Sequence, residues 1–140
     1  MSEEKASMVL TCSKEAFRIY DVLCKSEETE GKRTKKGREN IFSSRTPAFF
    51  LAVAIGLLRG KQGFKEKEKQ LTRRDYIINH PNFAPFEQLI KIKYNLKSQK
   101  DVVDEMLKFQ EMGIRELYDE YHKTGRIDFL RLYRDAKSGL

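Results

Sequence analysis

The stretch RTPAFFLAVAIGLLRG, residues 45–60, is the most apolar part of a highly charged chain of 140 residues. From Ala48 to Leu58 every residue except Gly56 is apolar, and the flanking residues are mostly polar or basic. A helix over these residues spans roughly 16 Å at about 1.5 Å per residue, which is about half of a roughly 30 Å bilayer core. The stretch therefore predicts a helix that is covered on most sides by protein and does not cross a membrane.

Small residues recur at every fourth position of this predicted helix. Ala48, Ala52 and Gly56 share one face, against which a second helix can pack near the short end of the roughly 8–10 Å range of axis separations. Two interpretations follow from this stripe. It is either a tight contact within the monomer or the candidate interface of a homo-oligomer.

The hydrophobic pattern of the whole chain predicts a mainly α protein: a single compact domain, residues 8–140, of about five helices with at most one short N-terminal strand at 8–12. Ser13 is a candidate N-cap for a first helix that ends near Lys25. Ser98, with Asp101 three residues later, resembles a capping box and predicts that the longest helix runs from there to about Lys123.

Other segments are expected to be irregular or short. Residues 1–7 predict a disordered tail, and residues 26–40, which contain no apolar side chain, predict a mobile basic loop. Residues 61–74 are expected to form an exposed loop or a hairpin-like arm. A final short helix is expected around residues 127–136.

Positive charge is concentrated in the centre of the chain. The net charge is +7, whereas residues 31–74 alone contain 13 basic and 3 acidic side chains. Such an imbalance favours a polyanion or an acidic partner as the compensating charge, although two solvated basic loops without a ligand are the simpler alternative. The expected phosphate-binding residues are Lys32, Arg33, Lys35, Lys36, Arg38, Arg59, Lys61, Arg73 and Arg74.

Catalytic and metal-binding patterns are weak. Cys12 and Cys24 are expected to be free, buried thiols in the reducing cytoplasm, and His80 and His122 stand apart from them in the sequence. We therefore expect no metal site and no cofactor. One short pattern is compatible with a metal-dependent nuclease, in which acidic residues and a lysine position metal and water; its residues are Asp128, Asp135 and Lys137.

Two segments resemble a known protein family. IFSSRTPAFFLAVAIGLLRGKQ (41–62) and MGIRELYDEY (112–121) resemble segments of the small proteins encoded beside DNA phosphorothioation (dnd) genes. The order of a first helix, a loop, and a Thr-Pro that opens an apolar helix is similar, more loosely, to the DndE family, whose members are small, α-helical, oligomeric DNA-binding proteins. The resemblance implies an accessory of a DNA modification or defence system.

The leading hypothesis is therefore a non-enzymatic, cytoplasmic DNA-binding or DNA-associated protein of a modification or restriction complex, with protein subunits of that complex as further partners. An alternative is a protein–protein adaptor that docks through helix 47–58 onto an acidic subunit. The nuclease is the third hypothesis. No membrane partner is expected.

Overall fold

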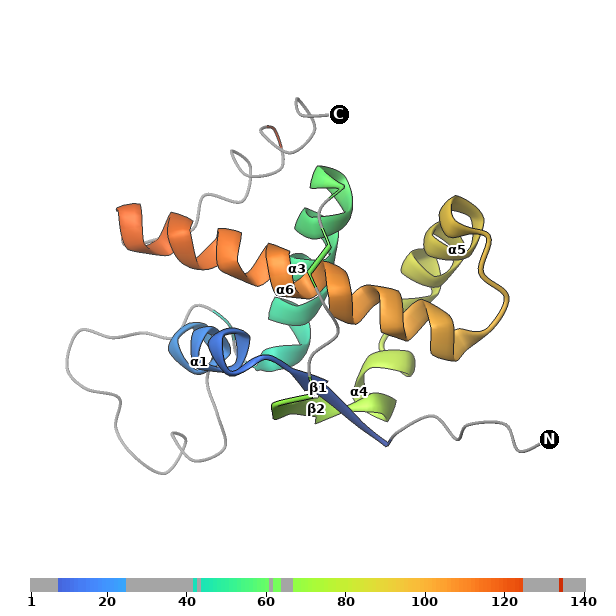
Figure 1. Ribbon diagram of the computed structural model, residues 1–140, viewed down its shortest axis with the longest axis horizontal. Helices are drawn as coiled ribbons and strands as arrows, with labels where there is room; N and C mark the ends of the chain where they lie inside the picture. Colours follow the sequence, from blue (N-terminus) through green and yellow to red (C-terminus); the bar gives the residue numbers. More distant parts are fainter. Residues whose placement is uncertain are drawn as a thin grey trace.

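The computed structural model describes residues 8–24, 42, 44–60, 62–63, 67–124 and 134. Helices dominate these residues, and they surround a core to which most elements contribute, with one small sheet near the N-terminus (Figure 1). This confirms the prediction of a mainly α fold. The elements are, in order, β1 (Val9–Cys12), α1 (Lys14–Leu23), α3 (Arg45–Arg59), β2 (Lys69–Arg73), α4 (Arg74–Ile78), α5 (Phe83–Tyr94) and α6 (Gln99–Thr124).

Local signals explain three helix ends. The Ser13 Oγ accepts a hydrogen bond from the Ala16 N–H at 3.0 Å and begins α1, and the Ser98 Oγ accepts one from the Asp101 N–H at 3.1 Å and begins α6. The apolar helix α3 ends at Gly60, whose φ of 66° lies in the left-handed region that glycine adopts without strain. The starts at Ser13 and Ser98 agree with the sequence-based predictions.

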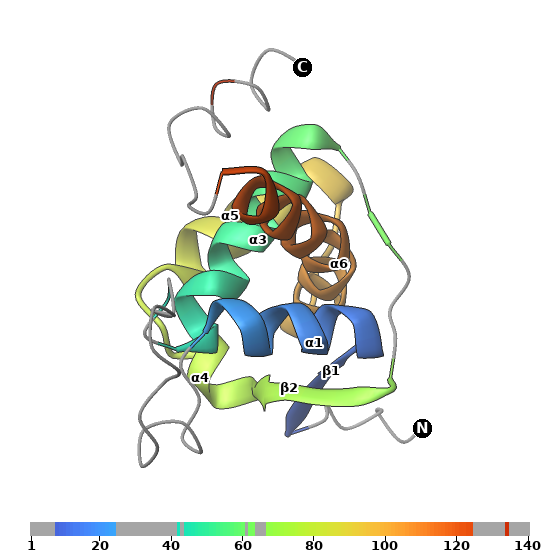
Figure 2. The ribbon, with the colours of Figure 1, turned by 90° about the vertical axis from the view of Figure 1, so that its left-hand side faces the viewer.

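The crossing of α3 and α6 is the centre of the molecule (Figures 1 and 2). The two backbones approach so closely that a Cβ added at Gly113 would lie 1.8 Å from the Ala52 carbonyl oxygen, and one added at Gly56 would lie 2.3 Å from the Phe109 carbonyl oxygen. Glycine is therefore required on both helices, because any side chain would push them apart.

This crossing corrects the prediction of an oligomer interface. Ala48 and Ala52 are fully buried, and Gly56 is buried with them, within a single chain. The stripe is used by the packing of α3 inside the monomer and has no surface left for a second copy.

The sheet consists of two antiparallel strands. Val9 pairs with Arg73 and Cys12 with Lys69, and the register shifts once within the ladder, between Leu10 and Thr11. The second strand was not predicted, since KQLTR contains one apolar residue and its partner lies about sixty positions earlier. Leu71 is the buried residue of β2, and α1 packs against both this strand and α6 (Figure 2).

Several predictions fall on residues outside the described part of the chain. They are the tail at 1–7, the whole of the basic loop at 26–40 with its flanking residues, and the final helix at 127–136 apart from Arg134. Among the helices of the described residues, none has the combination of length and apolar character that a membrane span requires. This agrees with the interpretation of the apolar stretch as a buried helix.

Candidate functional site

The nine expected phosphate-binding residues divide into two groups. Arg59, Arg73 and Arg74 belong to the described chain. The other six lie outside the described residues; they are Lys32, Arg33, Lys35, Lys36, Arg38 and Lys61. The candidate nucleic-acid interface is therefore built from the described residues around the first three.

Arg59 is placed apart from the other two arginines. It lies at the end of α3, and its Nη2 is 2.6 Å from the Glu116 Oε1 of α6, with the two side chains only 24% and 28% exposed. Arg45, at the opposite end of α3, contacts the strand that ends in Arg73 and lies roughly 20 Å from Arg59 along the helix axis. The Arg59–Glu116 pair joins α3 to α6, so Arg59 is a packing residue and is removed from the phosphate-binding set.

Arg73 and Arg74 lie where β2 meets α4, and both remain accessible in part. The Arg73 side chain is 57% exposed and forms an ion pair with Asp75, with an Nε to Oδ1 distance of 3.2 Å. Such an exposed pair contributes about 0–1 kcal/mol. A phosphate oxygen can therefore replace the Asp75 carboxylate with little loss.

The start of α6 is joined to this junction. The Arg74 Nη2 donates a hydrogen bond to the Gln99 Oε1 at 3.2 Å, and Lys97 is exposed two residues before Gln99. Lys69 is exposed at the other end of β2. We call these four cations, Lys69, Arg73, Arg74 and Lys97, the basic surface.

The ends of the segment 25–41 attach on the same side of the molecule. The Phe42 N–H donates to the Leu23 carbonyl at 3.0 Å, and Cys24 and Phe42 form a parallel bridge that closes the segment. Arg45, three residues after Phe42, donates from Nη1 to the Leu71 carbonyl of β2 at 2.9 Å. The Nη2 of the same guanidinium pairs with the Asp21 Oδ1 of α1 at 2.8 Å, so Arg45 joins the start of α3 to both α1 and β2.

Aromatic rings accompany these cations. The Arg45 and Lys69 side chains lie over the Phe17 ring, at 4.7 and 5.6 Å from its centroid. The Arg73 guanidinium lies 5.7 Å from the centroid of the Tyr76 ring. Basic groups interleaved with aromatic rings are typical of surfaces that bind nucleic acids.

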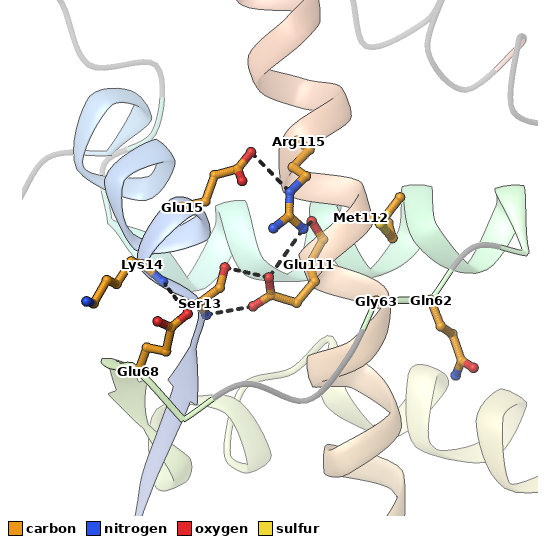
Figure 3. A pocket seen from close by; sticks show the side chains of 9 residues that line it. All are labelled: Ser13, Lys14, Glu15, Gln62, Gly63, Glu68, Glu111, Met112 and Arg115. Carbon is orange, nitrogen blue, oxygen red and sulfur yellow. Dashed lines mark hydrogen bonds and ion pairs between the residues drawn. The ribbon is translucent and has the colours of Figure 1, made fainter.

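A separate pocket of about 570 Å³ lies between the start of α1, the middle of α6 and the residues Gln62, Gly63 and Glu68 (Figure 3). Its central group is the Glu111 carboxylate, which is 2% exposed. That carboxylate accepts hydrogen bonds from the Ser13 N–H at 2.9 Å, the Ser13 hydroxyl at 2.7 Å and the Gln110 amide at 3.0 Å. Arg115 lies between the Glu111 carboxylate and Glu15 (Figure 3).

The pocket's polar groups mainly bind each other. The Tyr20 hydroxyl extends the network by donating to the Gln110 Oε1 at 2.8 Å, and the Lys14 N–H donates to Glu68. Glu111 and Glu68 thus place negative charge at the positive end of α1. We interpret the network as the contact that fixes α1 on α6, since its donors and acceptors already have partners.

Sequence reasoning missed this network because Ser13 and Glu111 are 98 positions apart. A signal was nevertheless present. Gln110 and Glu111 fall on the apolar stripe of the longest helix, between Leu107 and Ile114. Polar residues at positions that face the core require buried hydrogen-bond partners.

The cysteines and histidines considered as candidate metal ligands or catalytic residues are buried or pack against aromatic rings. Cys12 and Cys24 are free and buried, as predicted, and burial raises the pKa of each thiol from 9.0 to about 12. The His80 ring packs on Phe50 with centroids 4.8 Å apart, and His122 packs on Tyr118 at 4.3 Å. Within the described ranges no group of three or more His, Cys, Asp or Glu side chains is arranged to hold a metal ion.

The described residues leave the nuclease and docking hypotheses open. The nuclease residues Asp128, Asp135 and Lys137 lie outside the described chain. Docking through helix 47–58 stays a hypothesis: Phe49 and Val53 are fully buried and Ile55 is 3% exposed within the monomer, whereas Leu51, Ala54 and Leu58 of the same helix are partly exposed. Comparison with protein-family models, curated proteins and solved structures found no significant match to this chain.

Proposed function

We propose that this protein is a non-enzymatic DNA-binding accessory of a DNA modification or restriction system of the phosphorothioation type, acting in the cytoplasm. One observation carries the DNA-binding part: cations at the end of β2 and at the start of α6, about 25 positions apart in the sequence, are brought together by the Arg74–Gln99 hydrogen bond and remain accessible in part or in full. The assignment to a modification system rests on the resemblance of residues 41–62 and 112–121 to dnd-associated proteins.

Binding would be dominated by phosphates. Lys69, Arg73 and Lys97 are exposed, and each cation that replaces a counterion on DNA adds to an affinity that depends on salt and little on base sequence. The five basic residues between 32 and 38 belong to the segment whose ends are closed by the Cys24–Phe42 bridge. They would add contacts to the same DNA backbone.

A salt titration tests the proposal. A labelled duplex should bind at 50 mM salt and be released progressively up to 200 mM, with log K falling linearly against log salt concentration. The Arg73→Gln/Arg74→Gln variant should bind more weakly, and its slope should be less steep by about 0.9 for each phosphate contact removed.

A matched variant supplies the control. Arg18→Gln/Lys123→Gln removes the same charge from the exposed side of α1 and from the last turn of α6, which is roughly 35 Å along the helix from Gln99. It should keep the slope of the unmodified protein. Absence of duplex binding at 50 mM salt, or equal losses in the two variants, would reject the basic surface as a duplex-binding site.

A further inference from the structure

Tyr76 is an exposed aromatic residue in the middle of α4. The residue is 56% exposed, whereas its neighbour Ile77 is fully buried. The buried Ile77 anchors this single turn of helix to the core, so the position of the Tyr76 backbone is fixed while its ring faces solvent. An exposed ring on an anchored turn loses little conformational freedom when a ligand stacks on it.

The surroundings of the ring are basic. The Arg73 guanidinium lies 5.7 Å from the ring centroid, and Arg74 follows it directly. The Arg74 N–H donates to the Met8 carbonyl at 2.9 Å, which brings a 63% exposed methionine to the same end of the sheet. An anionic ligand with a flat apolar group matches this combination of cations and apolar surface.

We infer that Tyr76 stacks on an unpaired nucleobase, so that the basic surface prefers single-stranded over duplex DNA. This inference rests on the proposed function. Phosphates of both DNA forms can reach Arg73 and Arg74, but only an unpaired base exposes its face to an aromatic ring. Stacking on one ring accounts for about a tenfold gain in affinity.

The test compares three labelled ligands of equal length by fluorescence anisotropy: oligothymidine, an abasic strand with the same phosphates, and a duplex. Tyr76→Ala should weaken oligothymidine binding about tenfold. It should leave the abasic strand and the duplex unchanged. Tyr76→Phe keeps the ring and should bind like the unmodified protein, and Leu89→Ala, at a 50% exposed apolar residue of α5, should have no effect.

The possible failures are distinguishable. Unchanged oligothymidine binding by Tyr76→Ala, with duplex binding that still follows the salt titration, overturns the stacking inference and leaves the proposed function standing. An equal loss for the oligothymidine and the abasic strand also overturns it, because the residue then acts through the fold. If none of the three ligands binds at 50 mM salt, both the inference and the proposed function are rejected.

Discussion

The α3–α6 crossing and the basic surface use polar and small residues in opposite ways. At the crossing, Gly56 and Gly113 let two backbones touch, and the charged pairs nearby, Arg59–Glu116 and Arg115–Glu111, are largely buried. At the basic surface, Arg73 is mostly exposed and its pair with Asp75 is open to solvent. The two regions differ in how their polar groups are paired. Residues that fix the fold have buried partners within the protein, whereas residues that can bind a ligand have solvent-exposed partners that the ligand can replace.

Substitution at the crossing should have the largest effect on stability. In Gly113→Ala the new Cβ would lie 1.8 Å from the Ala52 carbonyl oxygen, so α3 and α6 must separate. We expect the free energy of unfolding, measured by urea denaturation, to fall by at least about 3 kcal/mol.

Gly60→Ala is the matched control for that substitution. Gly60 has a φ of 66° but no atom within 4 Å of the position of its added Cβ, so only backbone strain of about 1 kcal/mol applies. A smaller loss for Gly113→Ala than for Gly60→Ala would show that the helices do not approach as closely as described.

Removal of the buried carboxylate should have the next largest effect. Glu111→Ala leaves the Ser13 N–H, the Ser13 hydroxyl and the Gln110 amide without the carboxylate that accepts their hydrogen bonds, while Arg115 keeps its pair with Glu15. The expected loss of unfolding free energy is about 3 kcal/mol. Asp119→Ala, at an exposed position of the same helix, should change it by less than about 0.5 kcal/mol. Similar values for both variants would contradict the network.

The two buried cysteines predict that the protein loses stability at alkaline pH. Burial raises the pKa of Cys12 and Cys24 from 9.0 to about 12. Because the folded state holds the thiol protons more tightly than the unfolded state, the stabilisation is complete below pH 9 and is lost as the pH rises towards 12. Between pH 8 and pH 10, ionisation of each thiol in the unfolded state should lower the free energy of unfolding by about 1.4 kcal/mol.

The alkaline effect has its own control. A Cys12→Ala/Cys24→Ala variant should show a flatter pH dependence over the same interval, measured by urea denaturation at each pH. The same pH profile in the variant and the unmodified protein would mean that other groups cause the loss.

Substitution of Arg59 or Arg73 should cause the smallest changes in stability, and the comparison distinguishes the roles of these two arginines. Arg59→Ala removes the half-buried pair with Glu116 and should lower the unfolding free energy by about 1 kcal/mol without changing the salt slope of DNA binding. Arg73→Ala should change stability by less than about 0.5 kcal/mol and reduce the slope by about 0.9. If Arg73→Ala lowered the stability and Arg59→Ala reduced the salt slope, the assignment of Arg59 to packing and of Arg73 to DNA binding would be wrong.

Most helices were predictable from the sequence because their signals are local. Ser13, Ser98 and Gly60 mark helix ends through contacts within a few residues, and the apolar run 48–58 identifies a buried helix by composition alone. The pairing of β1 with β2, the contact of Ser13 with Glu111 and the separation of Arg59 from Arg73 were not predictable. Each depends on which distant segments meet.

The sequence by itself thus determined the helical class, the buried apolar helix and the excess of positive charge in residues 31–74. The tertiary structure decided that the small-residue stripe faces α6 of the same chain and that Arg73 and Arg74 lie beside the start of α6. The physical reason is that hydrogen-bonded turns and caps act over a few residues, whereas burial of apolar surface and the pairing of charges act between segments that are close only after folding.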